Sequence, residues 1–377
     1  MARLGEVLKI EASREKHDAE SYWLLNLDMV EQQTGRIISY NYVGEDDLDG
    51  SIVQFDTACV LYSKLRPNLN KVVVPEQNGF ATSEMLPLRP NKDVLSRDYL
   101  AVFLRSDSFV TWAVSKTAGA KMPRLGTKEL LSKEIPLPSL KEQERISKQF
   151  GKVDELIALR KEQLAKLDEL VKARFVEMFG DAVSNEKGRP LATLAEIAEI
   201  KIGPFGSLLH KEDYKTGGHA LINPSHIIGG RIVIDDNLTI DDAKYAELSA
   251  YHLYPGDIVM GRRGEMGRCA VVYQNGLLCG TGSLIIRPNE RMKPYFLQSI
   301  LSSPTYKKVI EDKAVGVTMM NLNVPIVSEL TVPLLPVDLQ EQFIRFMEKT
   351  DETKLTIQAS LDKLEVMKKA LMQEYFG

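Results

Sequence analysis

One stretch constrains this chain more than any other: residues 135–180, which read IPLPSLKEQERISKQFGKVDELIALRKEQLAKLDELVKARFVEMFG. After two prolines, apolar residues recur at steps that alternate between four and three: Ile146, Phe150, Val153, Ile157, Leu164, Leu167, Val171 and Met178. Arg160 and Arg174 occupy the two positions that break this stripe. A heptad seam of this length predicts a long helix that packs along another long helix.

A second copy of this stretch lies at residues 332–377, VPLLPVDLQEQFIRFMEKTDETKLTIQASLDKLEVMKKALMQEYFG. Seven residues recur at a constant offset of 197 (377 − 180): Leu164, Lys166, Leu167, Lys172, Glu177, Phe179 and Gly180 return as Leu361, Lys363, Leu364, Lys369, Glu374, Phe376 and Gly377. Near the helix start, Glu142-Gln143 returns as Glu341-Gln342, which indicates a small insertion. The second copy is more divergent, with Thr350, Lys354 and Lys368 at seam positions.

The segments between the two helices repeat as well. Arg89-Pro90-Asn91 returns as Arg287-Pro288-Asn289, and four further residues match: Ser106, Gly119, Met122 and Leu125 return as Ser303, Gly316, Met319 and Leu322. Matches outside the helices are hard to explain by helical composition alone, so we interpret the chain as a duplication. The predicted domains are 1–140 (globular), 141–180 (helix), 181–336 (globular) and 337–377 (helix). The predicted fold class is α+β, with two mixed α/β domains, two long helices forming an antiparallel coiled coil, and a pseudo-twofold internal repeat.

Composition limits the class of protein. No apolar run is long enough to cross a bilayer, and the first residues carry acids without an apolar core, so we expect a cytoplasmic protein without a secretory signal. Three cysteines are too few for a disulfide framework or a zinc site. The net charge of −4 counts weakly against a nucleic-acid binder, but the local distribution of charge matters more than the total.

Two stretches of the first half are basic and contain no acid. The first, residues 62–71, offers Ser63, Lys64, Arg66, Asn68, Asn70 and Lys71, and the second, residues 116–128, offers Lys116, Lys121, Arg124 and Lys128. Side chains of these types bind phosphates and base edges. We interpret them as candidate DNA contacts, with Lys121 and Arg124 foremost. The alternatives are a solvated hairpin turn and a loop that packs back on a helix through Met122 and Leu125.

The second half carries three candidate segments. A Gly-Pro-rich loop at 201–214 offers Lys201, Ser207 and Lys211, and the most basic segment, at 262–269, offers Arg262, Arg263 and Arg268. This basic segment occupies the place that residues 64–71 have in the first half. A neutral segment, with Thr318, Asn321 and Asn323, replaces the Lys121–Arg124 loop. We expect its contacts to be weaker or directed more to bases.

Motifs for catalysis are missing from the sequence. It contains no N-P-P-Y or D-P-P-Y motif, no F-x-G-x-G loop and no phosphate-binding G-x-x-x-x-G-K-[ST]. The five histidines show no metal-ligand spacing. We therefore expect no catalytic residue, no metal and no cofactor, and we consider an enzyme the weaker hypothesis.

A globular domain that ends in I-P-L-P-x-L-x-E-Q, then a helix with K-L-D-E-L-x-K-x-R-F-x-E-M-F-G, and the whole pattern given twice, resembles the DNA-specificity subunit of a type I restriction–modification system. The loops Gly119–Leu125 and Gly203–Ser207 resemble loops of that family's target-recognition domains. The resemblance implies that this chain binds double-stranded DNA, and that two modification subunits methylate adenine in each half-site. It also implies restriction subunits that cleave DNA with ATP, so that catalysis lies in the partners.

The helices suggest how such a target is measured. A helix of about 38 residues is about 57 Å long, which exceeds one DNA turn of about 34 Å, so the expected target is two half-sites with a fixed gap. The seam residues Arg160, Arg174, Lys354 and Lys368 are candidates for bonding partner helices. Alternatively, they extend to water from the seam edge. A coiled-coil scaffold without DNA specificity is the other function considered, and the matched basic loops argue against it.

Overall fold

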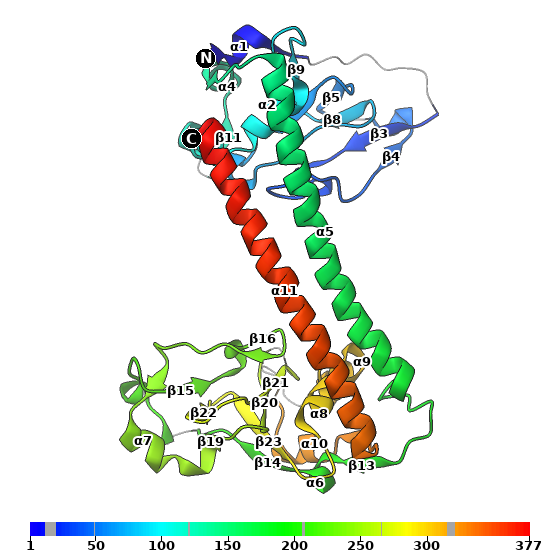
Figure 1. The fold of residues 1–377 in the computed structure, drawn as a ribbon, viewed down its shortest axis with the longest axis vertical. Helices are drawn as coiled ribbons and strands as arrows, with labels where there is room; N and C mark the ends of the chain where they lie inside the picture. Colours follow the sequence, from blue (N-terminus) through cyan, green and yellow to red (C-terminus); the bar gives the residue numbers. More distant parts are fainter. Residues whose placement is uncertain (12–19, 49, 120, 206–207, 265, 315–320) are drawn as a thin grey trace. The chain divides into compact units, whose positions relative to one another are not determined.

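The computed structural model describes residues 1–11, 20–48, 50–119, 121–205, 208–264, 266–314 and 321–377 (Figure 1). The chain divides into two compact units. Unit 1 consists of Met1–Gln163 together with Ile357–Gly377, and unit 2 consists of Leu164–Thr356. Both units combine helices with sheets, so the α+β class is confirmed.

Unit 1 contains two four-stranded sheets. The first is antiparallel, with the order β2 (Leu8–Ile10), β9 (Met85–Pro90), β6 (Val60–Ser63) and β7 (Val72–Val73). The second has the order β4 (Tyr42–Val43), β3 (Tyr22–Leu25), β8 (Gly79–Thr82) and β5 (Ile52–Phe55), and its β3–β8 pair is parallel. Two-stranded pairs join β1 (Ala2–Arg3) to β12 (Glu134–Ile135) and β10 (Thr117–Ala118) to β11 (Arg124–Leu125).

Unit 2 repeats the strand order of both four-stranded sheets. Its first sheet has the order β14 (Ala198–Ile202), β23 (Ser283–Pro288), β20 (Ile258–Gly261) and β21 (Cys269–Val271). Its second has the order β18 (Thr239–Ile240), β15 (His219–Ile222), β22 (Leu277–Cys279) and β19 (His252–Leu253), again with one parallel pair, β15–β22. The smaller pairs are β13 (Leu191–Thr193) with β24 (Thr331–Pro333), and β16 (Ile227–Ile228) with β17 (Arg231–Ile232).

Among the described residues, unit 2 has counterparts of the four short helices of unit 1 and one helix more, α7. Unit 1 has α1 (Leu4–Val7), α2 (Arg97–Leu104), α3 (Asp107–Ser115) and α4 (Thr127–Ser132). Unit 2 has α6 (Leu194–Ile197), α7 (Asp242–Glu247), α8 (Pro294–Leu301), α9 (Pro304–Lys313) and α10 (Val324–Ser328). Single 3₁₀ turns are η1 (Leu27–Met29), η2 (Glu45–Asp47), η3 (Pro67–Leu69), η5 (Lys211–Asp213), η6 (Pro224–His226) and η7 (Ser249–Tyr251).

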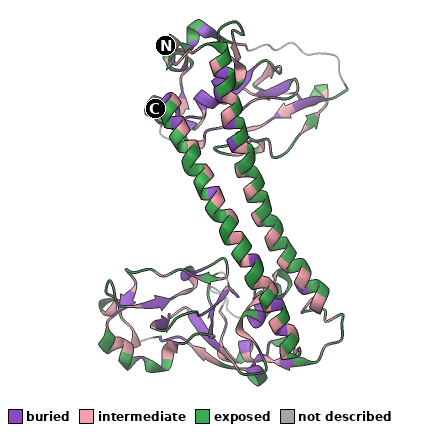
Figure 2. Cartoon of the chain, viewed as in Figure 1, coloured by how far each residue is buried: buried purple, intermediate pink, exposed green. Residues whose placement is uncertain are grey.

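Two long helices, α5 (Leu140–Phe179) and α11 (Val337–Phe376), lie where the sequence predicted 141–180 and 337–377. Each contributes its aromatic residues to a unit's core. In unit 1 the rings of Phe150 and Phe376 lie 6.3 Å apart between centroids, and in unit 2 Phe175 lies 5.4 Å from Phe343. Figure 2 shows the other faces of these helices largely exposed, as expected for their mixed charges.

A buried glutamine fixes the start of each long helix. Gln143 donates to the carbonyls of Val94 and Pro138, both at 2.9 Å, and its Oε1 accepts from the N–H of Ser96. Gln340 makes the equivalent three bonds, to the carbonyls of Arg291 and Leu335 and from the N–H of Lys293. Gln143 therefore corresponds to Gln340 at the constant offset of 197. The predicted match to Gln342, with its insertion, is wrong.

Two predicted elements are split by polar caps. The apolar residues of 97–115 favour one continuous helix, but Ser106 caps α3 and separates it from α2, because its Oγ accepts from the N–H of Phe109 at 3.3 Å. The apolar residues of 52–61 likewise favour one continuous strand. Asp56 accepts from the N–H of Ala58 at 2.9 Å, and this turn separates β5 from β6, which belong to different sheets.

Candidate nucleic-acid interface

The two basic stretches of unit 1 are joined by backbone hydrogen bonds. The loop from β6 to β7 contacts the segment that becomes β11: the N–H of Leu125 donates to the carbonyl of Lys64 at 2.9 Å, and the N–H of Arg66 donates to Pro123 at 2.8 Å. Leu65 also forms a β-bridge with Arg124. The structure thus brings together the two segments that the sequence selected separately.

The loop presents some of its polar side chains outward. Arg66 and Asn70 adopt left-handed backbone angles, with φ of 51° and 48°, and bracket the 3₁₀ turn η3. Such angles are unfavourable for residues with a Cβ and are maintained by surrounding contacts. Arg66, Asn68 and Lys121 are exposed, and Lys64 is half-buried. These four side chains remain accessible to a ligand.

Three other predicted residues of this loop point inward and bond to backbone carbonyls. Ser63 is 3% exposed and donates to the carbonyl of Leu65, while Asn70 is 6% exposed and donates to the carbonyl of Arg105. Lys71 Nζ donates to the carbonyl of Leu27, and burial lowers the pKa of its ammonium group. These three side chains hold the loop in shape.

Arg124 is engaged in a bidentate ion pair. Its Nε and Nη2 donate to Glu84 at 3.0 and 2.9 Å, and this pairing raises the pKa of the guanidinium. The sequence did not point to Glu84, which lies 40 residues away in the chain. An ion pair of this form fixes the direction of Arg124.

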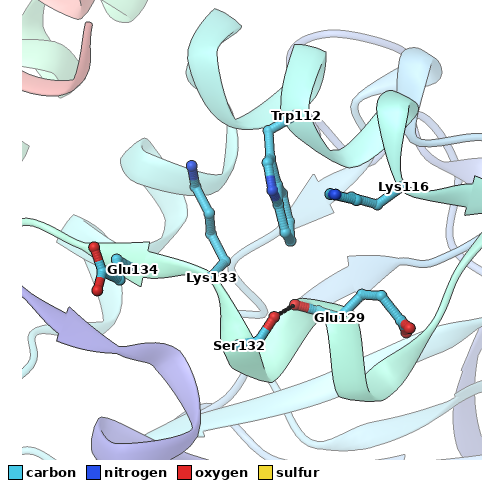
Figure 3. A pocket seen from close by; sticks show the side chains of 6 residues that line it. All are labelled: Trp112, Lys116, Glu129, Ser132, Lys133 and Glu134. Carbon is cyan, nitrogen blue, oxygen red and sulfur yellow. Dashed lines mark hydrogen bonds between the residues drawn. The ribbon is translucent and has the colours of Figure 1, made fainter.

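Lys116 and Lys128 are exposed, and Lys116 lines a hollow of about 360 Å³ (Figure 3). Lys133 Nζ lies 5.0 Å above the ring centre of Trp112, and Figure 3 shows this ring between Lys133 and Lys116. Because Glu129 and Glu134 also line the hollow, its charges balance. Lys116 therefore lies in a neutral setting, unlike Arg66.

Unit 2 gathers the corresponding segments at one end of its first sheet. The N–H of Leu322 donates to the carbonyl of Arg262 at 3.0 Å, as Leu125 does to Lys64 in unit 1. The N–H of Gly203 donates at 2.9 Å to the carbonyl of Ser283, which is the strand partner of Gly261. The predicted correspondence between residues 262–269 and the loop at 64–71 is therefore confirmed.

Arg262, however, is an internal residue. It is 5% exposed, its Nε donates to the carbonyl of Thr281, and its Nη1 donates to Asn321 Oδ1 at 3.1 Å. Burial lowers the pKa of its guanidinium. Arg263 is exposed and Arg268 is half-buried. Among these three bases, Arg263 has the most accessible side chain.

The remaining predictions of unit 2 fall in varied settings. Lys201 pairs with Glu199 at 2.8 Å. Asn323 caps α10, since its Oδ1 accepts from the N–H of Ile326 at 2.9 Å. Ser207, Thr318 and the side chain of Lys211 lie outside the described part of the chain.

The four polar seam residues bond within the chain. In unit 1, Arg160 donates to Ser360 Oγ at 3.2 Å and Lys368 pairs with Asp154 at 2.6 Å. In unit 2, Lys354 pairs with Asp168. There Arg174 pairs with Glu177 at 2.8 Å and lies 6.0 Å from the ring centre of Phe346. Each therefore contributes to helix contacts in its own unit.

Within the residues that the structure describes, no cluster of three or more His, Cys, Asp or Glu side chains could hold a metal ion. The same residues include no helix with the length and apolar character needed to cross a membrane.

Comparison with known proteins gives these loops a context. Residues 3–169 match the family model for the type I restriction modification DNA specificity domain. The type I restriction enzyme EcoDI specificity subunit of Escherichia coli is 25% identical over 154 residues, which are 40% of this chain and 34% of that protein. The MjaVIII specificity subunit of Methanocaldococcus jannaschii is 21% identical over 313 residues, covering 78% and 73%. The chain thus spans only about a third of the E. coli relative.

Solved structures agree in fold. The type I restriction–modification S subunit from M. genitalium matches all of this chain and 95% of that one, with a TM-score of 0.61 and 16% identity. A chain from a structure of type I R-M complex assembly matches with a TM-score of 0.63 and 17% identity, covering 100% and 96%. The resemblance to specificity subunits that the sequence indicated is confirmed.

Proposed function

We propose, on the premise that the chain is a relative of type I restriction–modification specificity subunits, that it recognises DNA sequence and leaves catalysis to partner subunits. The observation that carries this proposal is a hydrogen-bonded junction between two loops, which occurs once in each unit. In each unit, two segments selected as DNA contacts are hydrogen-bonded side by side, through Leu125 and Lys64 in unit 1 and through Leu322 and Arg262 in unit 2. A scaffold has no need for such a junction in both units.

The two junctions present different chemistry to DNA. Unit 1 offers Arg66 and Lys121, whose charges suit phosphates and guanine, and Asn68, whose amide suits adenine. Unit 2 offers the exposed Arg263 and the half-buried Arg268. The proposed target therefore has two different half-sites.

We further propose that α5 and α11 form an antiparallel coiled coil that sets the distance between half-sites. The ion pairs Lys368–Asp154 in unit 1 and Lys354–Asp168 in unit 2 support this arrangement, because α11 numbers fall as α5 numbers rise. Inserting one heptad in α5 adds about 10 Å, or about three base pairs. The gap of the methylated sequence should lengthen while both half-sites stay the same. An unchanged gap would refute the spacer.

The family relationship supports a set of partners. We propose that two modification subunits bind this chain and methylate one adenine per half-site, and that restriction subunits join for cleavage, in the cytoplasm. Methylation requires the adenine to leave the base stack, which the partners would accomplish while this chain holds the flanking DNA.

The decisive experiment maps adenine methylation across the genome of cells that express the chain with its neighbouring modification subunit, with and without this gene. A gapped, two-part motif that disappears on deletion is the expected result. Methylation that persists unchanged would favour the coiled-coil scaffold.

A further inference from the structure

Unit 2 contains an open hollow of about 470 Å³ that none of the DNA-contact candidates lines. Its floor is apolar, formed by Pro190 and by residues 334–337, and two arginines, Arg189 and Arg291, complete its lining. The floor belongs to the segments that lead into β13 and from β24 to α11. The hollow therefore combines hydrophobic surface with two positive charges.

Neither guanidinium forms a close ion pair with a described residue, and the charge of Arg291 acts on Glu196 only at longer range. Arg189 and Arg291 make no side-chain hydrogen bond or ion pair with any residue that the structure describes, and Nε of Arg189 is buried without a partner. The exposed Arg231 of the same unit, by contrast, pairs with Asp351 at 3.1 Å. A donor buried beside apolar surface without a partner is unfavourable. An anionic ligand would relieve this cost.

The backbones that carry the two arginines are held firmly. Asn185 brackets Arg189: its Oδ1 accepts from the N–H of Arg189 at 2.9 Å, and its Nδ2 donates to the carbonyl at 2.8 Å. The carbonyl of Arg291 accepts from the buried Gln340 at 3.0 Å. Across the floor, the N–H of Leu334 donates to Pro190 at 2.7 Å. These bonds fix the backbone of both arginines and leave their side chains available to a ligand.

We propose that this hollow binds an acidic, apolar peptide segment of another protein, in which carboxylates flank bulky hydrophobic side chains. Carboxylates match the guanidinium fork, and leucine-like side chains match the floor. The apolar surface continues outside the hollow to Leu191, which is 52% exposed and pairs with Pro333 in β24. An extended chain can follow this surface, whereas a small anion would use only the hollow. This inference does not depend on DNA recognition.

The test pans a display library of random 12-residue peptides against the full chain, in parallel with the R189Q/R291Q variant. The matched control is K308Q/K313Q, which removes two exposed charges from α9 of the same unit. We expect enriched peptides to combine Asp or Glu with Leu, Ile or Phe. Synthetic copies should bind R189Q/R291Q about tenfold or more weakly than the parent chain, and bind K308Q/K313Q normally.

Enriched peptides without acidic residues, or the same peptides enriched on both variants, would overturn the proposal. Equal weakening by K308Q/K313Q would reduce the effect to net charge and also overturn it. Dodecanoate serves as the small-anion probe, and saturable binding of it without any acidic peptide would reassign the hollow to a small apolar anion. DNA binding by R189Q/R291Q should match that of the parent chain. A loss of peptide binding alone therefore tests the hollow without testing the proposed function.

Discussion

Units 1 and 2 share a backbone plan but place their charges differently. Both have the same strand order in two sheets, the same serine cap and the same buried glutamine. Yet the repeated arginines differ in setting: Arg89 pairs with Asp56, which is 38% exposed, whereas Arg287 pairs with Asp257, which is 3% exposed. A duplicated fold thus conserves its backbone bonds, whereas the acidic partner of a repeated arginine is exposed in one unit and buried in the other.

The strongest test of this difference replaces the two aspartates. Asp257 accepts from Arg287 at 2.7 and 2.8 Å and from the N–H of Tyr254 at 2.8 Å. Asp257→Ala should lower the free energy of unfolding of unit 2 by about 2–3 kcal/mol, because the N–H of Tyr254 and the partly exposed guanidinium of Arg287 both lose a buried acceptor. Asp56→Ala should cost unit 1 about 1 kcal/mol or less, since water replaces an exposed carboxylate.

The two units can be followed separately. Both tryptophans of the chain, Trp23 and Trp112, lie in unit 1, so their fluorescence in denaturant reports that unit. Hydrogen exchange of β20 and β23 reports unit 2. Similar losses in both units would show that the burial of Asp257 contributes nothing.

A second test compares the two loop junctions at Arg262 and Lys64. Arg262→Ala should destabilise unit 2 by about 2–3 kcal/mol, because Thr281 and Asn321 lose their donor. Lys64→Ala should change stability by less than about 0.5 kcal/mol but reduce the salt dependence of DNA binding by about one charge. Titrations of DNA at several salt concentrations measure this slope. If Arg262→Ala kept its stability and lost DNA affinity, Arg262 would be a contact residue.

The sequence could predict those elements in which apolar residues recur at a regular spacing. The heptad seam located α5 and α11, and the repeat located the matching loops. The roles of individual bases could not be predicted, because an arginine suits a phosphate and a carbonyl equally well. What makes Arg262 internal is Thr281 and Asn321, 19 and 59 residues away.

Local polar bonds account for the other differences. The caps at Ser106 and Asp56 interrupt apolar patterns that read as single elements. At the start of α11 the dipeptide Glu341-Gln342 looks like Glu142-Gln143, yet the buried position belongs to Gln340. The burial of the Gln340 amide identifies this residue as the equivalent of Gln143. A match between dipeptides does not show which side chain is buried.

The smallest expected effect is a difference between the two units in how the cost of losing one hydroxyl depends on pH. Ser108 and Thr305, 197 residues apart, each bond near the end of a long helix: Ser108 Oγ donates to the carbonyl of Phe376, and Thr305 Oγ1 donates to the carboxylate of Asp181, both at 2.7 Å. Burial alone would raise the pKa of Asp181, but the N–H of Ser184, the hydroxyl of Thr305 and other donors together lower it below its ordinary value of 3.8.

A carboxyl whose pKa is lower in the folded state stabilises the fold above its ordinary pKa, and this contribution is lost as the pH falls through the folded value. Thr305→Val should therefore cost unit 2 about 1 kcal/mol at neutral pH and progressively less as the pH falls below the ordinary carboxyl value of 3.8. Ser108→Ala should cost unit 1 a similar amount at every pH, because its acceptor is a carbonyl that does not titrate. Denaturant unfolding across this range, followed in each unit separately, measures both. A parallel pH dependence in the two variants would show that the Asp181 carboxylate is not the acceptor that distinguishes unit 2.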